Sequence, residues 1–252
     1  MLDLLLPRRC GVCGCTLLAR ERHLCTECAM KMPLTYFWLQ ERNPMADRFN
    51  ERIEEGLTQD VLNGRQPSRE QYAFATALYF YKDDYRELSK SLKYRAAVSL
   101  GRYVAQALGR KIAACSFLGD VDLVVPVPLH PLRRLKRGYN QAQVIAESIV
   151  EVLEGGKNVS LACGVLRRGR NTTSQTFIDV AHKAENVSGA FSVRMDCLPQ
   201  CRHILLVDDV CTTASTLAEC QRTLRGALVE KFGPEAGQAV RISAATLAFV
   251  GD

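Results

Sequence analysis

The sequence contains no stretch of eighteen consecutive apolar residues, and it therefore predicts no membrane-spanning helix. Residues 1–7 have too short an apolar run and no basic segment for a secretory signal peptide, so we expect a cytoplasmic location without membrane insertion. A large excess of one charge is also lacking, because 33 basic and 27 acidic side chains leave a net charge of +6. This balance suits an anionic ligand, but alone it does not establish nucleic-acid binding.

The chain does have the length and the apolar content of a folded α/β protein. Its 252 residues are enough for one substantial domain with a small appendage, and the hydrophobic share of 47% excludes a disordered chain. Apolar runs typical of strands alternate with helical patterns; the runs lie at 73–81, 121–127, 161–166, 186–193, 203–207 and 239–250. This alternation predicts a parallel sheet with helices on both faces.

Residues 203–218 carry the clearest chemical signal. A short, branched apolar run at 203–207 reads as a buried strand, and Asp208 and Asp209 follow where that strand would end. Small and hydroxylated residues come next, before a helical pattern; they are Thr212, Thr213, Ala214, Ser215 and Thr216. A helix start offers outward N–H groups and a favourable dipole for an anion, while paired carboxylates suit ribose hydroxyls or a metal that holds a pyrophosphate.

The simpler interpretation of this stretch is an ordinary N-capped helix after a core strand. Asp, Thr and Ser are common capping residues, so the composition alone permits it. An adjacent acidic pair together with five small or hydroxylated residues exceeds what a cap requires. We therefore interpret residues 208–216 as a binding site for a sugar phosphate.

Cysteines form the second signal, near the N-terminus. Two CxxC pairs are separated by a short loop; they are Cys10 with Cys13, and Cys25 with Cys28. Two such pairs complete a tetrahedral Zn²⁺ site, and in a reducing compartment clustered thiols are metal ligands before they are disulfides. The alternatives are reduced thiols without a metal, or a redox pair. Cys15 and His23 are near enough to be ligands, but we expect them to be spectators.

Between the cysteines and the sheet lies a segment with weaker signals. We expect a zinc-binding knuckle at 1–35, a linker or helical insertion at 36–71 and an α/β domain at 72–252. An amphipathic pattern predicts a helix at 46–62. Trp38 and its aromatic neighbours are expected to pack the knuckle against the α/β domain, with a stacking platform for nucleic-acid bases as the alternative.

Two basic segments follow strands of the expected sheet. Four cations lie within 133–137, after the strand at 121–127, where ligands of open α/β sheets bind. A polar loop at 167–175 follows the strand at 161–166, and its length and composition are typical of a mobile loop. Either segment could contact a pyrophosphate or a nucleic-acid backbone, and a plain surface loop is the alternative.

These landmarks occur together in one order. They are CxxC…CxxC, Lys93-Tyr94, PVPLHPLRRLKRGYNQA at 126–142, the polar loop at 167–175, NVSGAF at 186–191 and LLVDDVCTTAST at 205–216. The last motif resembles the phosphoribosyl pyrophosphate (PRPP) motif of type I phosphoribosyltransferases, and the set resembles the ComF family of competence proteins. The resemblance implies a type I phosphoribosyltransferase-like sheet fused to a four-cysteine zinc knuckle.

The resemblance also implies roles for individual residues. Asp208 and Asp209 would hold the ribose of PRPP, and residues 212–216 its 5′-phosphate. The pyrophosphate side, with Mg²⁺, would involve Arg137, Asn140 and Gln141. The polar loop would form a flexible hood; its candidate residues are Arg167, Thr173 and Gln175. Two positions depart from the family pattern: Ala214 stands where Gly is usual, and Lys183 where Arg is usual.

Two functions follow from these expectations. One is a PRPP-binding protein associated with DNA uptake in natural transformation, with single-stranded DNA and a competence helicase as partners. Its candidate nucleic-acid contacts are Arg133, Arg134, Lys136 and Lys93. The other is an active cytosolic phosphoribosyltransferase of nucleotide metabolism without a DNA role. No residue reads as an acid–base catalyst for a particular nucleobase.

Overall fold

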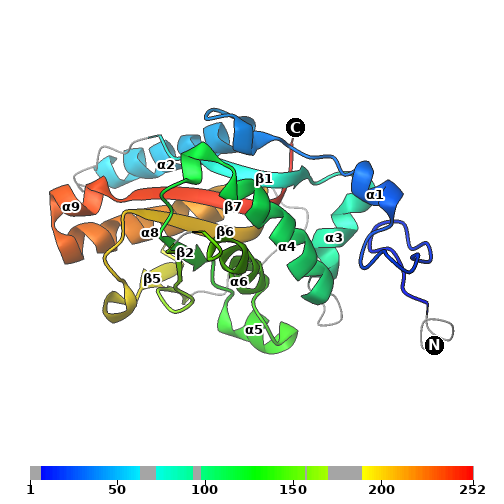
Figure 1. Ribbon diagram of the computed structural model, residues 1–252. Coiled ribbons are helices and arrows are strands. Elements are labelled where there is room, and N and C mark those ends of the chain that lie inside the picture. Colours follow the sequence, from blue (N-terminus) through cyan, green and yellow to red (C-terminus); the bar gives the residue numbers. More distant parts are fainter. Residues whose placement is uncertain (1–6, 63–71, 93–97, 157, 170–188, 252) are drawn as a thin grey trace.

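A five-stranded parallel sheet forms the centre of the protein, with strand order β1-β7-β6-β2-β3 (Figure 1). This computed structural model describes residues 7–62, 72–92, 98–156, 158–169 and 189–251. The strands are β1 (Ala75–Phe80), β2 (Leu123–Pro126), β3 (Ser160–Leu161), β6 (His203–Cys211) and β7 (Arg241–Phe249). The predicted α/β class is confirmed.

Helices cover both faces of this sheet. Alternate residues of β6 enter two separate cores, because successive side chains of a strand point to opposite faces. Leu205 and Val207 pack with α4 (Val98–Ala113) and α6 (Gln141–Leu153). Ile204 and Leu206 pack with α2 (Pro44–Leu62) and α8 (Ser215–Phe232). The smaller α3 (Arg86–Ser91) and α9 (Pro234–Ala239) adjoin α4 and α8.

The central strand β6 is longer than its apolar run predicts. The sequence indicated an end at Val207, but β6 continues to Cys211, which pairs with Phe249 of β7. On its other side β2 stops at Pro126, opposite Val207. Asp208 and Asp209 therefore lie inside β6, beyond the end of β2, and not after the strand as expected.

Three other segments differ from their sequence expectations. The run at 161–166 is not one strand: β3 ends at Leu161, and β4 (Leu166–Arg168) pairs antiparallel with β5 (Phe191–Val193). The basic segment after β2 is a short helix, α5 (Pro131–Arg137), whose N-cap is His130 and whose end is Gly138 at φ 81°. The stretch at 233–237, whose two glycines and proline favour a loop, instead leads into the short helix α9 (Pro234–Ala239).

The helix expected at 46–62 is present as α2 and begins two residues earlier. Asn43 caps it, because its side-chain oxygen accepts hydrogen bonds from the N–H groups of Met45 (3.1 Å) and Ala46 (3.0 Å). Phe49 and Ile53 are buried in the second core, whereas Val61 is half exposed. None of the described helices combines the length and the apolar character needed to cross a bilayer.

The N-terminal segment is tied to the free edge of β1. The N–H of Thr35 donates to the carbonyl of Leu78 (3.1 Å), and the N–H of Phe80 donates to the carbonyl of Pro33 (2.8 Å). Trp38, in the short helix η2 (Phe37–Leu39), is buried in the same core as Cys10, as expected for a residue that joins knuckle and sheet. An aromatic platform at Trp38 is disfavoured by this burial.

Candidate functional site

The strand order reverses between β2 and β6, so the sheet has a topological switch point at its carboxyl edge, and we refer to this position as the crevice. The chain leaves β2 toward β3 through α6, and it leaves β6 toward β7 through α8. Because α6 and α8 cover opposite faces, the segments after these two neighbouring strands separate. Such a switch point is where open α/β sheets bind ligands. Residues 127–141 and 208–216, both selected from the sequence, flank it.

The acidic pair lies at this crevice and is half-buried. The N–H of Asp209 donates to Oδ1 of Asp208 (2.8 Å), and the N–H of Val210 donates to Oδ1 of Asp209 (2.8 Å). Burial and the neighbouring charge of Asp209 raise the pKa of Asp208 well above its usual value, although Arg168 acts in the opposite direction. The charged form of such a carboxyl group is stabilised by a ligand that supplies hydroxyl donors or positive charge.

The hydroxyl-rich loop passes directly into α8. Ala214 is the N-cap and adopts the left-handed conformation, with φ 58°. The Oγ atoms of Thr213 and Ser215 lie 3.0 Å apart. The first N–H groups of an α-helix have no partner within the helix and carry a partial positive charge, so this end of the 18-residue α8 favours an anion.

Three arginines interact electrostatically near the switch point. Burial and, after it, the charges of Arg168 and Arg137 lower the pKa of Arg133. Arg168 also influences Asp208 electrostatically, and its guanidinium lies 5.2 Å from the centre of the Phe191 ring. Sequence reasoning selected Arg167 from this segment, but Arg167 is exposed. Because every second residue of a strand lies on the same face, Arg168 shares a face with buried Leu166. This alternation would have selected Arg168 instead.

The segment after β2 contributes amide groups as well. Nδ2 of Asn140 donates to the carbonyl of Val127 (3.0 Å), and Nη1 of Arg137 donates to Oε1 of Gln141 (3.2 Å). Gln141 is 2% exposed, and its Nε2 has no hydrogen-bond partner among the residues that the structure describes. A buried amide donor without an acceptor is expensive, and a ligand oxygen would satisfy it.

The other candidate residues fall into two groups. Arg134 and Lys136 are exposed on α5, which projects at the lower edge of Figure 1. The remaining candidates lie outside the described residues; they are Lys93, Thr173 and Gln175, together with Lys183. Arg133, expected as a nucleic-acid contact with Arg134 and Lys136, is half-buried instead.

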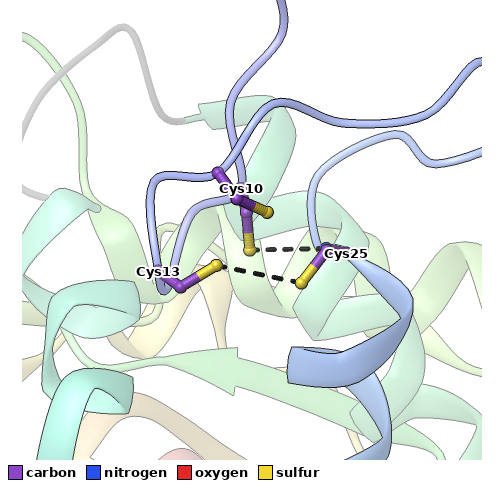
Figure 2. Close-up of side chains that lie close together, drawn as sticks. Cys10, Cys13 and Cys25 are labelled. Carbon is purple, nitrogen blue, oxygen red and sulfur yellow. Dashed lines mark hydrogen bonds between the residues drawn. The ribbon is translucent and has the colours of Figure 1, made fainter.

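Three of the four predicted cysteine ligands converge, but the cluster contains Cys15 in place of the predicted Cys28. Figure 2 shows Cys10, Cys13 and Cys25 directed toward one another, with 3.8 Å between the sulfurs of Cys13 and Cys25. A tetrahedral Zn²⁺ with bonds of about 2.3 Å separates its sulfurs by about 3.8 Å, so this spacing fits the ion. The sulfurs of Cys10, Cys13, Cys15 and Cys25 all lie within 4.8 Å of one another. Cys15, expected to be a spectator, is therefore inside the cluster.

Backbone groups around the cluster favour a thiolate. The N–H of Cys25 donates to the sulfur of Cys10 (3.3 Å), and the N–H of Cys28 donates to the sulfur of Cys25 (3.4 Å). Burial raises the pKa of Cys10, but the N–H groups around it outweigh burial and lower the pKa to about 6. Gly14 makes its turn at φ 72°, whereas a Cβ at Gly11 would meet Cδ2 of Leu100 at 2.7 Å. The absence of a side chain at Gly11 thus lets the backbone of the cysteine segment pack closely against α4.

Comparison with known proteins adds independent support. Residues 1–37 match the family model described as a double zinc ribbon domain. The chain is 33% identical over 112 residues to Competence protein F of Haemophilus influenzae, which is 44% of this chain and 47% of that protein. The resemblance to the ComF family is confirmed.

A second set of relatives matches over a similar length. DNA utilization protein YhgH of Escherichia coli K12 is 33% identical over 103 residues, 41% of this chain and 43% of that protein. The YhgH protein of Salmonella typhi is 31% identical over the same number of residues, 103. The chain thus spans less than half the length of the curated relatives it matches. No solved structure matches the chain.

Proposed function

We propose that this protein binds PRPP in the crevice between the ends of β2 and β6 and acts in DNA uptake during natural transformation. The observation that carries the proposal is the meeting of three groups at the switch point. The acidic pair lies on β6 and the start of α8 follows it, whereas Arg133 and Arg137 lie on α5, after β2. A phosphorylated sugar requires both chemistries, donors for its anions and acceptors for its hydroxyls.

Each part of PRPP has a matching set of residues in this proposal. The 5′-phosphate would rest on the N–H groups and hydroxyls of residues 212–216. The ribose hydroxyls would donate to Asp208 and Asp209. The pyrophosphate would lie toward Arg137, Asn140 and Gln141, whose buried Nε2 would gain an acceptor. Mg²⁺ prefers oxygen ligands, and carboxylates of this pair would hold it against the pyrophosphate, where it would neutralise charge.

If turnover occurs, a nucleophile displaces pyrophosphate at C1 of the ribose through an oxocarbenium-like transition state. The chain would contribute positioning and charge stabilisation. His130 is engaged as the N-cap of α5, where its Nδ1 accepts from the N–H of Leu132 (3.3 Å). A cytosolic phosphoribosyltransferase without a DNA role is the second candidate function.

The DNA role is inferred from the names of the relatives and from the exposed cations of α5. Competence and DNA utilization are what those relatives are named for. Arg134 and Lys136 could contact the backbone of single-stranded DNA, with the zinc knuckle and a competence helicase as further parts of the assembly. Clustered thiols that hold Zn²⁺ favour a reducing compartment, so we place the protein in the cytoplasm.

Calorimetry with PRPP and Mg²⁺ tests the pocket. We expect saturable binding by the parent protein and no measurable binding by the double variant Asp208→Asn, Asp209→Asn. The matched control is the exposed pair after β1, altered to Asp83→Asn, Asp84→Asn, which should bind as the parent does. Equal affinity of the crevice variant and the parent would refute the pocket.

A further inference from the structure

Helix α2 reaches across to the loop that precedes α8. Nη1 of Arg48 donates to the carbonyl of Thr212 (2.8 Å), and Nε of Arg52 donates to the carbonyl of Thr213 (3.2 Å). The two arginines are one helical turn apart, so both face the loop. Helix α2 belongs to the segment with the weakest sequence signals, and none of its residues was a candidate for the site.

The same Arg48 also fixes the edge of the sheet beside the loop. Its Nη1 donates to the carbonyl of Val250 (2.6 Å), and its guanidinium lies 4.6 Å from the centre of the Phe249 ring. Because Cys211 pairs with Phe249, Arg48 joins the residues that follow the ends of β6 and β7. The loop thus begins at a point where Nη1 of Arg48 bridges two backbone carbonyls.

Because a trans peptide is planar, a contact that fixes a carbonyl also fixes the direction of the N–H group in the same peptide. The carbonyl of one residue and the N–H of the next point in opposite directions. Arg48 holds the carbonyl of Thr212 toward α2, so the N–H of Thr213 points away from α2. Arg52 likewise holds the carbonyl of Thr213 toward α2, so the N–H of Ala214 points away from α2.

We propose that Arg48 and Arg52 are positioning residues for the phosphate-binding loop. They keep the carbonyl oxygens of Thr212 and Thr213 turned toward α2, where these partial negative charges do not oppose the 5′-phosphate. Without them either peptide can rotate, and a rotated peptide presents an acceptor to the anion in place of a donor. This inference rests on the proposed function, since it concerns the same loop.

The test compares two ligands that occupy different parts of the crevice. Ribose 5-phosphate uses the loop, and pyrophosphate uses the opposite side. We expect Arg48→Gln and Arg52→Gln each to weaken ribose 5-phosphate binding by about 10-fold or more, the effect of losing one hydrogen bond to a charged group. Pyrophosphate affinity should change by less than about twofold. Arg48→Lys should restore part of the loss, because an ammonium can still donate to both carbonyls.

The control is Arg42→Gln, which removes the same charge from an exposed residue whose guanidinium stacks on Tyr72, at 4.6 Å from the ring centre. It should bind both ligands as the parent does. A purely structural role for the arginines would lower the melting temperature and leave both affinities unchanged, which would overturn the positioning role alone. A parent protein that binds neither ligand would overturn the proposed function, and this inference with it.

Discussion

Asp208→Asn should stabilise the free protein while it weakens sugar binding. In the parent, burial and the charge of Asp209 raise the pKa of Asp208, so the folded state holds this proton more tightly than the unfolded chain does. Such a carboxyl group reduces stability once the pH passes its unfolded pKa, near 3.9, and the loss grows until the pH reaches the folded pKa. Asparagine has nearly the same shape and no proton to lose.

The size of the effect follows from that difference in pKa. A raised pKa costs about 1.4 kcal/mol for each pH unit between the unfolded and folded values, and solvent at this half-buried site reduces the cost. We therefore expect Asp208→Asn to raise the free energy of unfolding by about 1–2 kcal/mol at pH 8. For a chain of this size, that corresponds to a melting temperature higher by about 2–8 °C.

Thermal unfolding of parent and variant between pH 4 and pH 8 measures this directly. The two proteins should melt together near pH 4, and the variant should melt progressively higher as the pH rises. The change Asp209→Asn should also raise the melting temperature at pH 8, because it removes a charge that opposes ionisation of Asp208. A variant that melts at or below the parent temperature throughout this range would refute the reasoning.

Three further outcomes are expected. Cys15→Ser and Cys28→Ser should differ in zinc content by elemental analysis: loss of zinc only from Cys28→Ser would assign Cys28 as the fourth ligand, and loss only from Cys15→Ser would exclude it. Ala214→Gly should raise the free energy of unfolding by about 0.5–1 kcal/mol, because glycine accepts a positive φ without strain, and denaturant titration would show it. The double variant Arg134→Gln, Lys136→Gln should weaken single-stranded DNA binding. The slope of log binding constant against log salt concentration should become shallower by about 1.4. An unchanged slope would exclude α5 as a contact.

Local signals account for what the sequence predicted correctly. A branched apolar run predicts a buried strand, a hydroxyl-rich stretch before a helical pattern predicts a helix start, and the CxxC pairs predict three of the four clustered cysteines. Each depends on residues within one element. Ala214 stands where the family pattern has Gly, and the structure gives it the left-handed conformation that Gly adopts most easily.

Non-local contacts account for what was missed. The extension of β6 to Cys211 depends on how far β7 continues beside it, which no property of residues 203–211 reveals. Arg48 and Thr212 are 164 positions apart in the chain, so α2 could be predicted as a helix but not as a support for the loop. The helix α5 is different, since its cues were present: a capping residue and Pro131 at its start, and Gly138 at its end.

The central claim is that the crevice between β2 and β6 receives a phosphorylated sugar. Amide NMR of the parent protein, titrated with PRPP in the presence of Mg²⁺, addresses it most directly. The account predicts saturable shifts of the N–H signals of residues 213–217 and of the side-chain amide of Gln141. Shifts that avoid both groups, or no shifts at millimolar PRPP, would contradict it.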